Sequence, residues 1–259
     1  MDYTFPVLFM GHGNPMNAVE DNSFTRGWTD AVKNLPVPKA IVCISAHWET
    51  KGTKVTAMEQ PKMIYDMYGF PQHLYEVNYN APGNPKLAEE IKNTVTSTKI
   101  NLDHDWGFDH GTWSVLVKMF PEANIPCIQL SLDRTRDLNY HYQLAQELLK
   151  FRNKGVLFVA SGNIVHNLRI IMQTANKPTD WAQEFDQKIA SLIIEGNHDP
   201  IINYKKLGQA AELSVNSAEH YIPLIYALGL RKKNEEASFF NHNQYQDLMS
   251  MGMRCVRIG

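Results

Sequence analysis

The sequence predicts a single α/β domain, residues 1–259, with a central sheet that is mostly parallel or mixed and has helices on both faces. Three observations lead to this fold class. Apolar runs rich in β-branched residues alternate with segments whose apolar residues recur at helical spacing. Runs such as 40–45 and 156–160 are apolar over nearly their whole length, as strands buried on both faces are. No repeat, linker or low-complexity tract divides the chain.

Composition and charge exclude several classes of protein. Hydrophobic residues make up 44% of the chain and charged residues 20%, as in soluble globular proteins. The net charge of −2 gives no electrostatic footprint for nucleic acid or an anionic membrane. No stretch reaches the roughly 18 apolar residues of a membrane span, and the first residues lack the features of a secretory signal. We expect neither a nucleic-acid nor a membrane partner, and the oligomeric state stays open.

The cysteines point to a reducing compartment. Cys43, Cys127 and Cys255 each lie in a strand-like run, and no CxxC pair is present. Such residues are typical of reduced, buried thiols that behave as small hydrophobes. We therefore expect a cytoplasmic protein.

In the first half of the chain, strands 3–10 and 40–45 flank a helix expected over 24–34, which Asn22 and Ser23 can cap. A further strand is expected at 55–58. The stretch 61–85 is rich in tyrosine, proline and glycine and has no clear period, which predicts a long ordered loop. Loops of this length are usually functional, so a role in covering a substrate is one interpretation and plain surface packing is the other.

The second half continues the alternation of helices and strands. Pro85 suits the first position of a helix that runs to about Thr96. The remaining expected elements are a strand at 125–131, a helix at 139–153, a strand at 156–160, a helix at 181–194, a short apolar helix ended by Gly229, and closing strands at 238–240 and 253–258.

Three of the predicted strands deliver a histidine at or shortly beyond their carboxyl ends. His12 lies between two glycines after the first strand, His47 follows the second, and His166 comes after 156–160. In an open α/β sheet, ligands bind in the crevice outside these strand ends. Because neutral imidazole is the commonest metal ligand among side chains, the pattern predicts a metal site.

Two further histidines stand in informative contexts. His220 begins the short apolar helix, and His110 precedes a helix expected to start at Gly111 or Thr112. The dipole of that helix disfavours a charged imidazolium, which suits a neutral acid–base group at His110. The remaining histidines lie in polar or loop contexts and receive no role: His73, His104, His141, His198 and His242.

Five sequence blocks resemble those of a known family, and they occur in the family's order over nearly the whole chain. They are Gly11-His-Gly-Asn-Pro15, Ser45-Ala-His-Trp48, Trp106-Gly-Phe-Asp-His-Gly-Thr-Trp113, Ser161-Gly-Asn-Ile-Val-His-Asn167 and Glu219-His-Tyr-Ile-Pro-Leu224. The family is that of the class III extradiol ring-cleavage dioxygenases, and the most similar branch acts on DOPA at the 4,5 bond.

The resemblance implies one α/β domain that holds a non-haem divalent metal and opens a catechol ring with O₂. It implies His12 and His47 as metal ligands and His220 as the third, although the adjacent Glu219 offers a carboxylate instead. It leaves His166 as a fourth ligand or as the base. Fe(II) is expected for turnover because zinc has no accessible redox change, while an all-histidine set also suits bound Zn(II).

The implied reaction needs a base for a catechol proton and an acid as the ring opens. We expect His166 to be the base and His110 the proton donor or substrate-orienting group, since the histidine pKa near 6.5 fits both tasks. Trp48, Trp106, Trp113 and the tyrosine-rich loop are candidate walls of an aromatic pocket, but core packing is the preferred explanation for each.

Two other functions compete with this one. The histidine-rich set is compatible with a zinc-dependent hydrolase, although no HExxH signature is present. Memo-type proteins resemble the same superfamily in fold and serve in partner recognition, so the third possibility is a non-catalytic binding protein.

Overall fold

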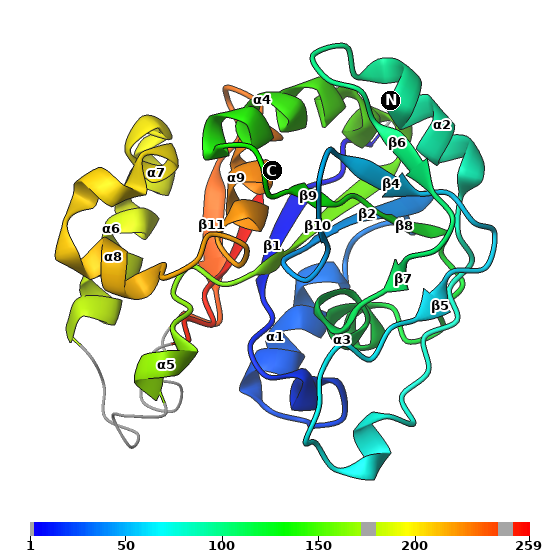
Figure 1. The fold of residues 1–259 in the computed structure, drawn as a ribbon, viewed down its shortest axis with the longest axis horizontal. Helices are drawn as coiled ribbons and strands as arrows, with labels where there is room; N and C mark the ends of the chain where they lie inside the picture. Colours follow the sequence, from blue (N-terminus) through cyan, green and yellow to red (C-terminus); the bar gives the residue numbers. More distant parts are fainter. Residues whose placement is uncertain (1–2, 172–179, 243–250) are drawn as a thin grey trace.

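The computed structural model describes residues 3–171, 180–242 and 251–259, and its centre is a six-stranded sheet (Figure 1). The strand order is β11-β12-β1-β10-β2-β8. Strands β1, β10, β2 and β8 are parallel to their neighbours in this series, whereas β12 is antiparallel to both β1 and β11. The predicted mixed α/β sheet is therefore confirmed. The strand bounds are β1 Val7–Gly11, β2 Ala40–Ser45, β8 Cys127–Gln129, β10 Val156–Gly162, β11 Ala237–Phe240 and β12 Cys255–Ile258.

Helices cover both faces of this sheet, because alternate strand residues enter two separate apolar clusters. Val7 and Phe9 of β1 join one cluster, and Leu8 and Met10 join the other. The first face is covered by α2 (Pro85–Thr94), α4 (Leu138–Leu148) and α9 (Ile222–Gly229). The second is covered by α1 (Ser23–Val32) and α3 (His110–Met119). Helices α6 (Asp180–Glu195) and α8 (Gln209–Ser214) lie beside the β11 edge (Figure 1).

Three short two-stranded pairs, β3 with β9, β4 with β6 and β5 with β7, lie outside the main sheet among the described residues. One of them, β5 with β7, ties the long loop 61–85 to the segment before α3. That loop is otherwise irregular apart from one 3₁₀ turn, as predicted. The short elements are β3 Glu49–Thr50, β4 Lys54–Thr56, β5 Lys62–Met63, β6 Asn101–Asp103, β7 Gly107–Phe108, β9 Leu132–Asp133, α5 Leu168–Ile171 and α7 Asp199–Ile202, with 3₁₀ turns at Pro15–Ala18, Gln72–Leu74, Leu149–Lys154 and Tyr204–Leu207.

Helix ends follow the local sequence signals closely. Asn22 caps α1 by accepting hydrogen bonds from the backbone N–H groups of Phe24 and Thr25, which confirms the predicted cap. Helix α2 begins at Pro85 as predicted. The helix expected over 139–153 is shorter, because its last turn tightens into a 3₁₀ segment that ends at Gly155 with φ +89°.

The structure confirms the expectation for the cysteines and contradicts the one for His141. All three cysteines are buried and unpaired, as expected. His141, by contrast, was assigned to a polar context, but it is fully buried in α4 with Nδ1 3.1 Å from the Tyr226 hydroxyl. Its position one turn before Leu144 and Ala145 places it on the helix face that meets the core. Among the described residues, no helix is both long and apolar enough to cross a membrane.

Candidate metal centre

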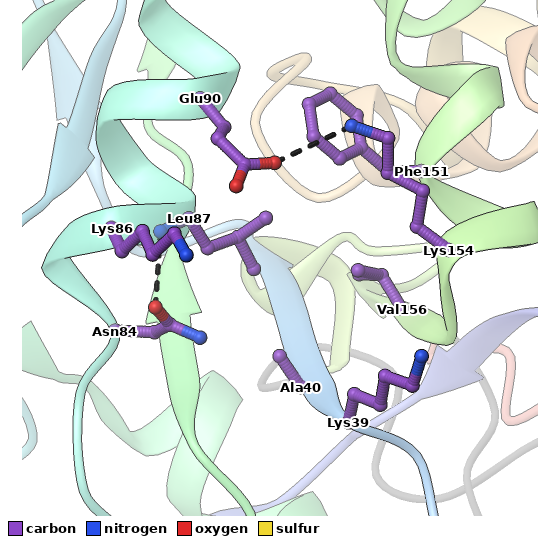
Figure 2. A pocket seen from close by; sticks show the side chains of 9 residues that line it. All are labelled: Lys39, Ala40, Asn84, Lys86, Leu87, Glu90, Phe151, Lys154 and Val156. Atoms are coloured by element: carbon purple, nitrogen blue, oxygen red, sulfur yellow. Dashed lines mark hydrogen bonds and ion pairs between the residues drawn. The ribbon is translucent and has the colours of Figure 1, made fainter.

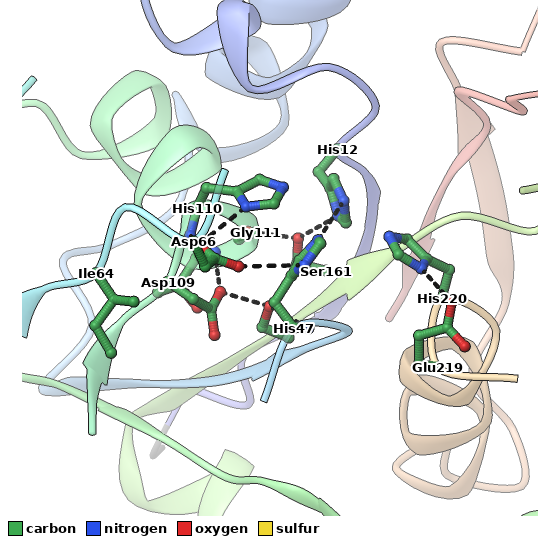
Figure 3. Close-up of polar contacts among 12 residues, drawn as sticks. His12, His47, Ile64, Asp66, Asp109, His110, Gly111, Ser161, Glu219 and His220 are labelled. Carbon is green, nitrogen blue, oxygen red and sulfur yellow. Dashed lines mark hydrogen bonds and ion pairs between the residues drawn. The ribbon is translucent and has the colours of Figure 1, made fainter. Parts of the chain in front are cut away.

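Three histidines from distant parts of the chain meet at the carboxyl edge of the sheet (Figure 3). His12 directly follows β1, His47 lies two residues after β2, and His220 lies two residues before α9. One ring nitrogen of each lies within 4.8 Å of those of the other two. The Nε2 atoms of His12 and His47 are only 3.3 Å apart.

Close backbone approaches bring these histidines together. A Cβ atom on Gly162, the last residue of β10, would lie 2.2 Å from the carbonyl oxygen of His220. Only glycine therefore lets the His220 turn pack directly on the strand end. Gly13 adopts φ +61°, which turns the chain sharply after His12. The glycines that flank the histidine motifs thus have steric causes.

The hydrogen bonds around His12 determine which ring nitrogen carries its proton. The Ser161 hydroxyl donates its proton to the carbonyl of Gly111 at 2.5 Å. Its oxygen lies 3.0 Å from His12 Nδ1 and can only accept there. His12 is therefore protonated at Nδ1, and its Nε2 atom presents a lone pair to the centre.

The other two histidines are held in the same tautomer by carboxylates. His220 Nδ1 lies 3.0 Å from a Glu219 oxygen, and His47 Nδ1 lies 3.3 Å from an Asp66 oxygen. His220 Nδ1 hydrogen-bonds to Glu219, whereas His47 Nδ1 and Asp66 are within ion-pair distance. A carboxylate oxygen accepts and cannot donate, so each of these contacts favours the proton on Nδ1. Glu219 contacts His220 through Nδ1 and does not belong to the group formed by His12, His47 and His220.

A divalent cation fits this arrangement. Burial first, and repulsion by neighbouring imidazoles second, holds the pKa of His12 and of His47 well below the ordinary value. Both rings are therefore neutral, and their facing lone pairs repel one another unless a cation lies between them. Two nitrogens about 2.1 Å from one ion at an angle of about 100° are about 3.2 Å apart, close to the observed 3.3 Å. Metal-binding histidines also typically donate their second N–H to a carboxylate or another acceptor.

His166 lies against this cluster in a different way. Its ring stacks on that of His220, with centroids 3.5 Å apart and an interplanar angle of 7°. Its backbone N–H donates to the Ser214 carbonyl at 2.8 Å. Its ring nitrogens group with Glu219 and His220, and it is absent from the group that contains His12. His166 therefore contacts His220 without joining the group that contains His12.

His110 is the first residue of α3, one residue earlier than the predicted helix start, because Asp109 supplies the cap and accepts from the Thr112 N–H at 3.1 Å. An Asp66 oxygen lies 3.0 Å from His110 Nδ1 and also accepts from its backbone N–H at 2.9 Å. Burial raises the pKa of Asp66, but hydrogen bonds and charge from His110 outweigh it and lower the pKa overall. The Asp66 carboxylate lies at the amino terminus of α3, where the helix dipole favours a negative charge. Sequence reasoning missed Asp66, although it is the single acidic residue in the first half of the long loop.

A cavity of about 240 Å³ opens onto the histidines. Met67 and Phe70 of the long loop form part of its wall, which supports a covering role for that loop. The described lining contains no tryptophan. Trp48 and Trp106 stack on each other, and Trp48 and Trp113 are buried, as the core-packing explanation predicts. The described lining residues are His12, Gly13, Asn14, Pro15, His47, Met67, Phe70, His110, His166, Leu168, His220 and Met251.

A larger cavity, of about 420 Å³, lies at the opposite end of the strands (Figure 2). Lys39, Lys86 and Lys154 reach it, and Lys154 pairs with Glu90 at 3.4 Å. Its described lining contains no histidine or cysteine. Size alone therefore does not identify the chemical site of this protein.

The metal-free protein is expected to lose stability as the pH falls below about 6.5. Burial, with repulsion by His220, lowers the pKa of His166 to about 3 in the folded state. Between these two values the unfolded chain binds a proton that the folded chain does not. The free energy of unfolding therefore decreases by up to about 1.4 kcal/mol per pH unit for this residue.

Urea unfolding of chelator-treated protein, at pH values between about 5 and 7.5, measures this slope. His166→Gln should reduce the slope, whereas His104→Gln, at an exposed position, should leave it unchanged. Equal slopes in His166→Gln and the wild type would contradict a neutral, half-buried His166.

Comparison with known proteins identifies the family. The family described as "Catalytic LigB subunit of aromatic ring-opening dioxygenase" matches residues 6–253. A curated relative from Escherichia coli K12, named 4,5-DOPA dioxygenase extradiol, is 45% identical over 229 residues, which cover 86% of this chain and 84% of the relative. A relative of the same name from Beta vulgaris is 34% identical over 253 residues, covering 95% and 94%.

A solved structure agrees with this result. The crystal structure of an uncharacterized protein from Escherichia coli K12 matches with a TM-score of 0.83 and 38% sequence identity, covering 98% of this chain and all of that one. The resemblance drawn from the five sequence blocks is confirmed. This chain belongs to the family of the catalytic LigB subunit of aromatic ring-opening dioxygenases.

Proposed function

We propose that this chain opens the ring of a DOPA-like catechol with O₂, using one Fe(II) ion held by His12, His47 and His220. The observation that carries the proposal is the convergence of three unprotonated imidazole nitrogens on an open cavity. Membership of a ring-opening dioxygenase family supports the reaction type. Relatives named 4,5-DOPA dioxygenase extradiol, at 45% and 34% identity, support this class of substrate.

The three histidines would hold the metal through Nε2, with their Nδ1 protons fixed by Ser161, Asp66 and Glu219. When bound, such an ion brings catechol and O₂ together and lets electrons pass between them. Both oxygen atoms enter the product, a ring-opened semialdehyde, and the catechol itself supplies the electrons. No external reductant is needed.

The chain's own residues would manage the protons. Burial lowers the pKa of His166 to about 3, so its ring is neutral at physiological pH and can accept a hydrogen bond from a catechol hydroxyl. It would act as the base towards a catechol whose own hydroxyl pKa a bound cation lowers. An Asp66 oxygen lies 3.0 Å from His110 Nδ1, which favours the proton on Nδ1 and would leave Nε2 as the nitrogen available to a substrate. From there it would orient the substrate or return a proton as the ring opens.

The cavity fits a small aromatic guest. Its volume of about 240 Å³ lies below the usual range for pockets that hold drug-sized ligands, which suits a single substituted ring. Met67, Phe70 and Met251 give it apolar and sulfur-bearing walls. Such walls contact a flat ring and reduce the access of water during the reaction.

Oxygen uptake tests the proposal directly. Protein loaded anaerobically with Fe(II) should consume O₂ when DOPA is added and should form a yellow, ring-opened semialdehyde. The Zn(II)-loaded protein should bind metal and consume no O₂, because zinc has no accessible redox change. No uptake with Fe(II) over a panel of catechols would overturn the proposal.

Neither competing function gains support from the site. A hydrolase would show equal activity of zinc-loaded and iron-loaded protein towards an ester or amide, and the family match gives no reason to expect this. A binding protein of the Memo type does not need an open cavity at the histidines, yet one is present. The buried, unpaired cysteines agree with the cytoplasm as the proposed location.

A further inference from the structure

One carboxylate, that of Asp66, contacts both the metal-binding and the proton-transferring parts of the site (Figure 3). Its Oδ2 atom lies 3.3 Å from His47 Nδ1. Its Oδ1 atom lies 3.0 Å from His110 Nδ1 and accepts the His110 backbone N–H at 2.9 Å. The rings of His47 and His110 lie side by side, with centroids 3.8 Å apart. The carboxylate therefore spans two histidines to which different tasks are assigned.

Asp66 also lies in the loop that forms part of the cavity wall. Asp66 belongs to the long loop 61–85, and its neighbour Met67 lines the cavity together with Phe70. The Asp66 side chain is only 20% exposed. A movement of this part of the loop would therefore change the cavity wall and the support of both histidines at once.

We propose that Asp66 is a positioning residue that couples the metal centre to the proton-transfer group. It holds His47 in the tautomer whose Nε2 can bind a metal, and it fixes the ring of His110 at the mouth of the cavity. This inference rests on the proposed function for the role of His110, while its part concerning His47 depends only on metal binding.

An amide at this position would place a hydrogen-bond donor, instead of an acceptor, opposite His47 Nδ1. In Asp66→Asn, the amide oxygen can keep the bond from the His110 backbone, but the amide nitrogen is a donor. Facing His47, it would favour a lone pair on Nδ1 and a proton on Nε2. That proton would occupy the lone pair that the metal needs. The two side chains have nearly the same shape, so the substitution isolates the hydrogen-bonding effect.

Zn²⁺ titration against a chromophoric chelator measures the effect without any catechol. Asp66→Asn should weaken Zn²⁺ binding about 10- to 100-fold, the usual cost of changing a group that orients a metal ligand. Asp66→Glu keeps an acceptor-only carboxylate and should bind Zn²⁺ more tightly than Asp66→Asn. The matched control is Glu76→Gln, which removes the same charge from an exposed position of the same loop and should bind Zn²⁺ as the wild type does.

Turnover of the Fe(II)-loaded variants separates positioning from a general loss of structure. Asp66→Asn, saturated with metal, should lower kcat for the catechol with little change in KM, because a neutral amide oxygen holds the Nδ1 proton of His110 less strongly than a carboxylate does, while the cavity remains. Wild-type Zn²⁺ affinity in Asp66→Asn would overturn the inference. Equal weakening in Asp66→Asn and Asp66→Glu would also overturn it, since a carboxylate would then have no special role.

The tautomers of His47 and His110 can be observed in the wild-type protein, so this test of the role of Asp66 does not require a folded variant. Long-range ¹H–¹⁵N spectra of the metal-free wild-type protein should show protonated Nδ1 atoms in His47 and His110. An unprotonated Nδ1 in His47 would overturn the inference. If the wild type binds Zn²⁺ with these tautomers but opens no catechol, the proposed function fails and the role of Asp66 towards His47 stands.

Discussion

Replacing His47 by alanine is expected to abolish metal loading and, with it, turnover. His47 supplies one of three convergent nitrogens, and its Nε2 atom lies 3.3 Å from that of His12. Structural zinc sites bind with about 10–16 kcal/mol shared among four ligands, so one ligand contributes about 3 kcal/mol, or more than 100-fold in affinity. Elemental analysis of freshly purified, anaerobically handled protein measures the metal content, and catechol-dependent O₂ uptake measures the activity.

The matched control for this substitution is His104→Ala, which removes an exposed imidazole outside the cavity. It should retain both the metal and the activity. A His47→Ala protein that purifies with one metal ion per chain would show that the centre does not use His47. The assignment of His12 and His220 as its co-ligands would then also be wrong.

Replacing His110 by alanine is expected to leave the metal in place and to remove most of the turnover. His110 lines the cavity, but it is absent from the group formed by His12, His47 and His220. Loss of a proton-transfer group typically lowers kcat by about 10²–10⁴-fold. Asp66 still contacts His47 in this variant, so the metal ligand keeps its support.

Metal analysis and kcat measured on the same preparation separate the two histidines. His110→Ala with full metal content and a low kcat supports the division of tasks. Loss of metal in both His47→Ala and His110→Ala would undo the role given to His110. Unchanged kcat in His110→Ala would leave His166 as the single proton-transfer candidate of the two.

The strand ends show how far sequence reasoning reaches. The apolar runs 40–45 and 156–160 correctly gave the parallel strands β2 and β10, because such runs satisfy a strand buried on both faces. The histidines that follow them were correctly expected at the carboxyl edge. Helix bounds were also close, since the Asn22 cap and Pro85 act locally.

Contacts between distant residues could not be obtained in this way. The sequence does not tell which of the adjacent side chains Glu219 and His220 faces the cavity. In the structure, His220 lines the cavity and lies with His12 and His47. The stacking of Trp48 on Trp106 is another contact between distant residues that no local pattern records. His141 was assigned to a polar context because its buried partner, Tyr226, lies 85 residues away.

The sequence by itself determined the fold class, the family and the four histidines near the site, because strand periodicity and short motifs are properties of neighbouring residues. Only the tertiary structure decided that His12, His47 and His220 converge, that His166 stacks beside them, and that Asp66 contacts two of the site histidines. The physical reason is that tautomers, charge and ligand geometry depend on distances between atoms a few ångströms apart. Folding sets those distances between segments up to about two hundred residues apart in the chain, and no local pattern records them.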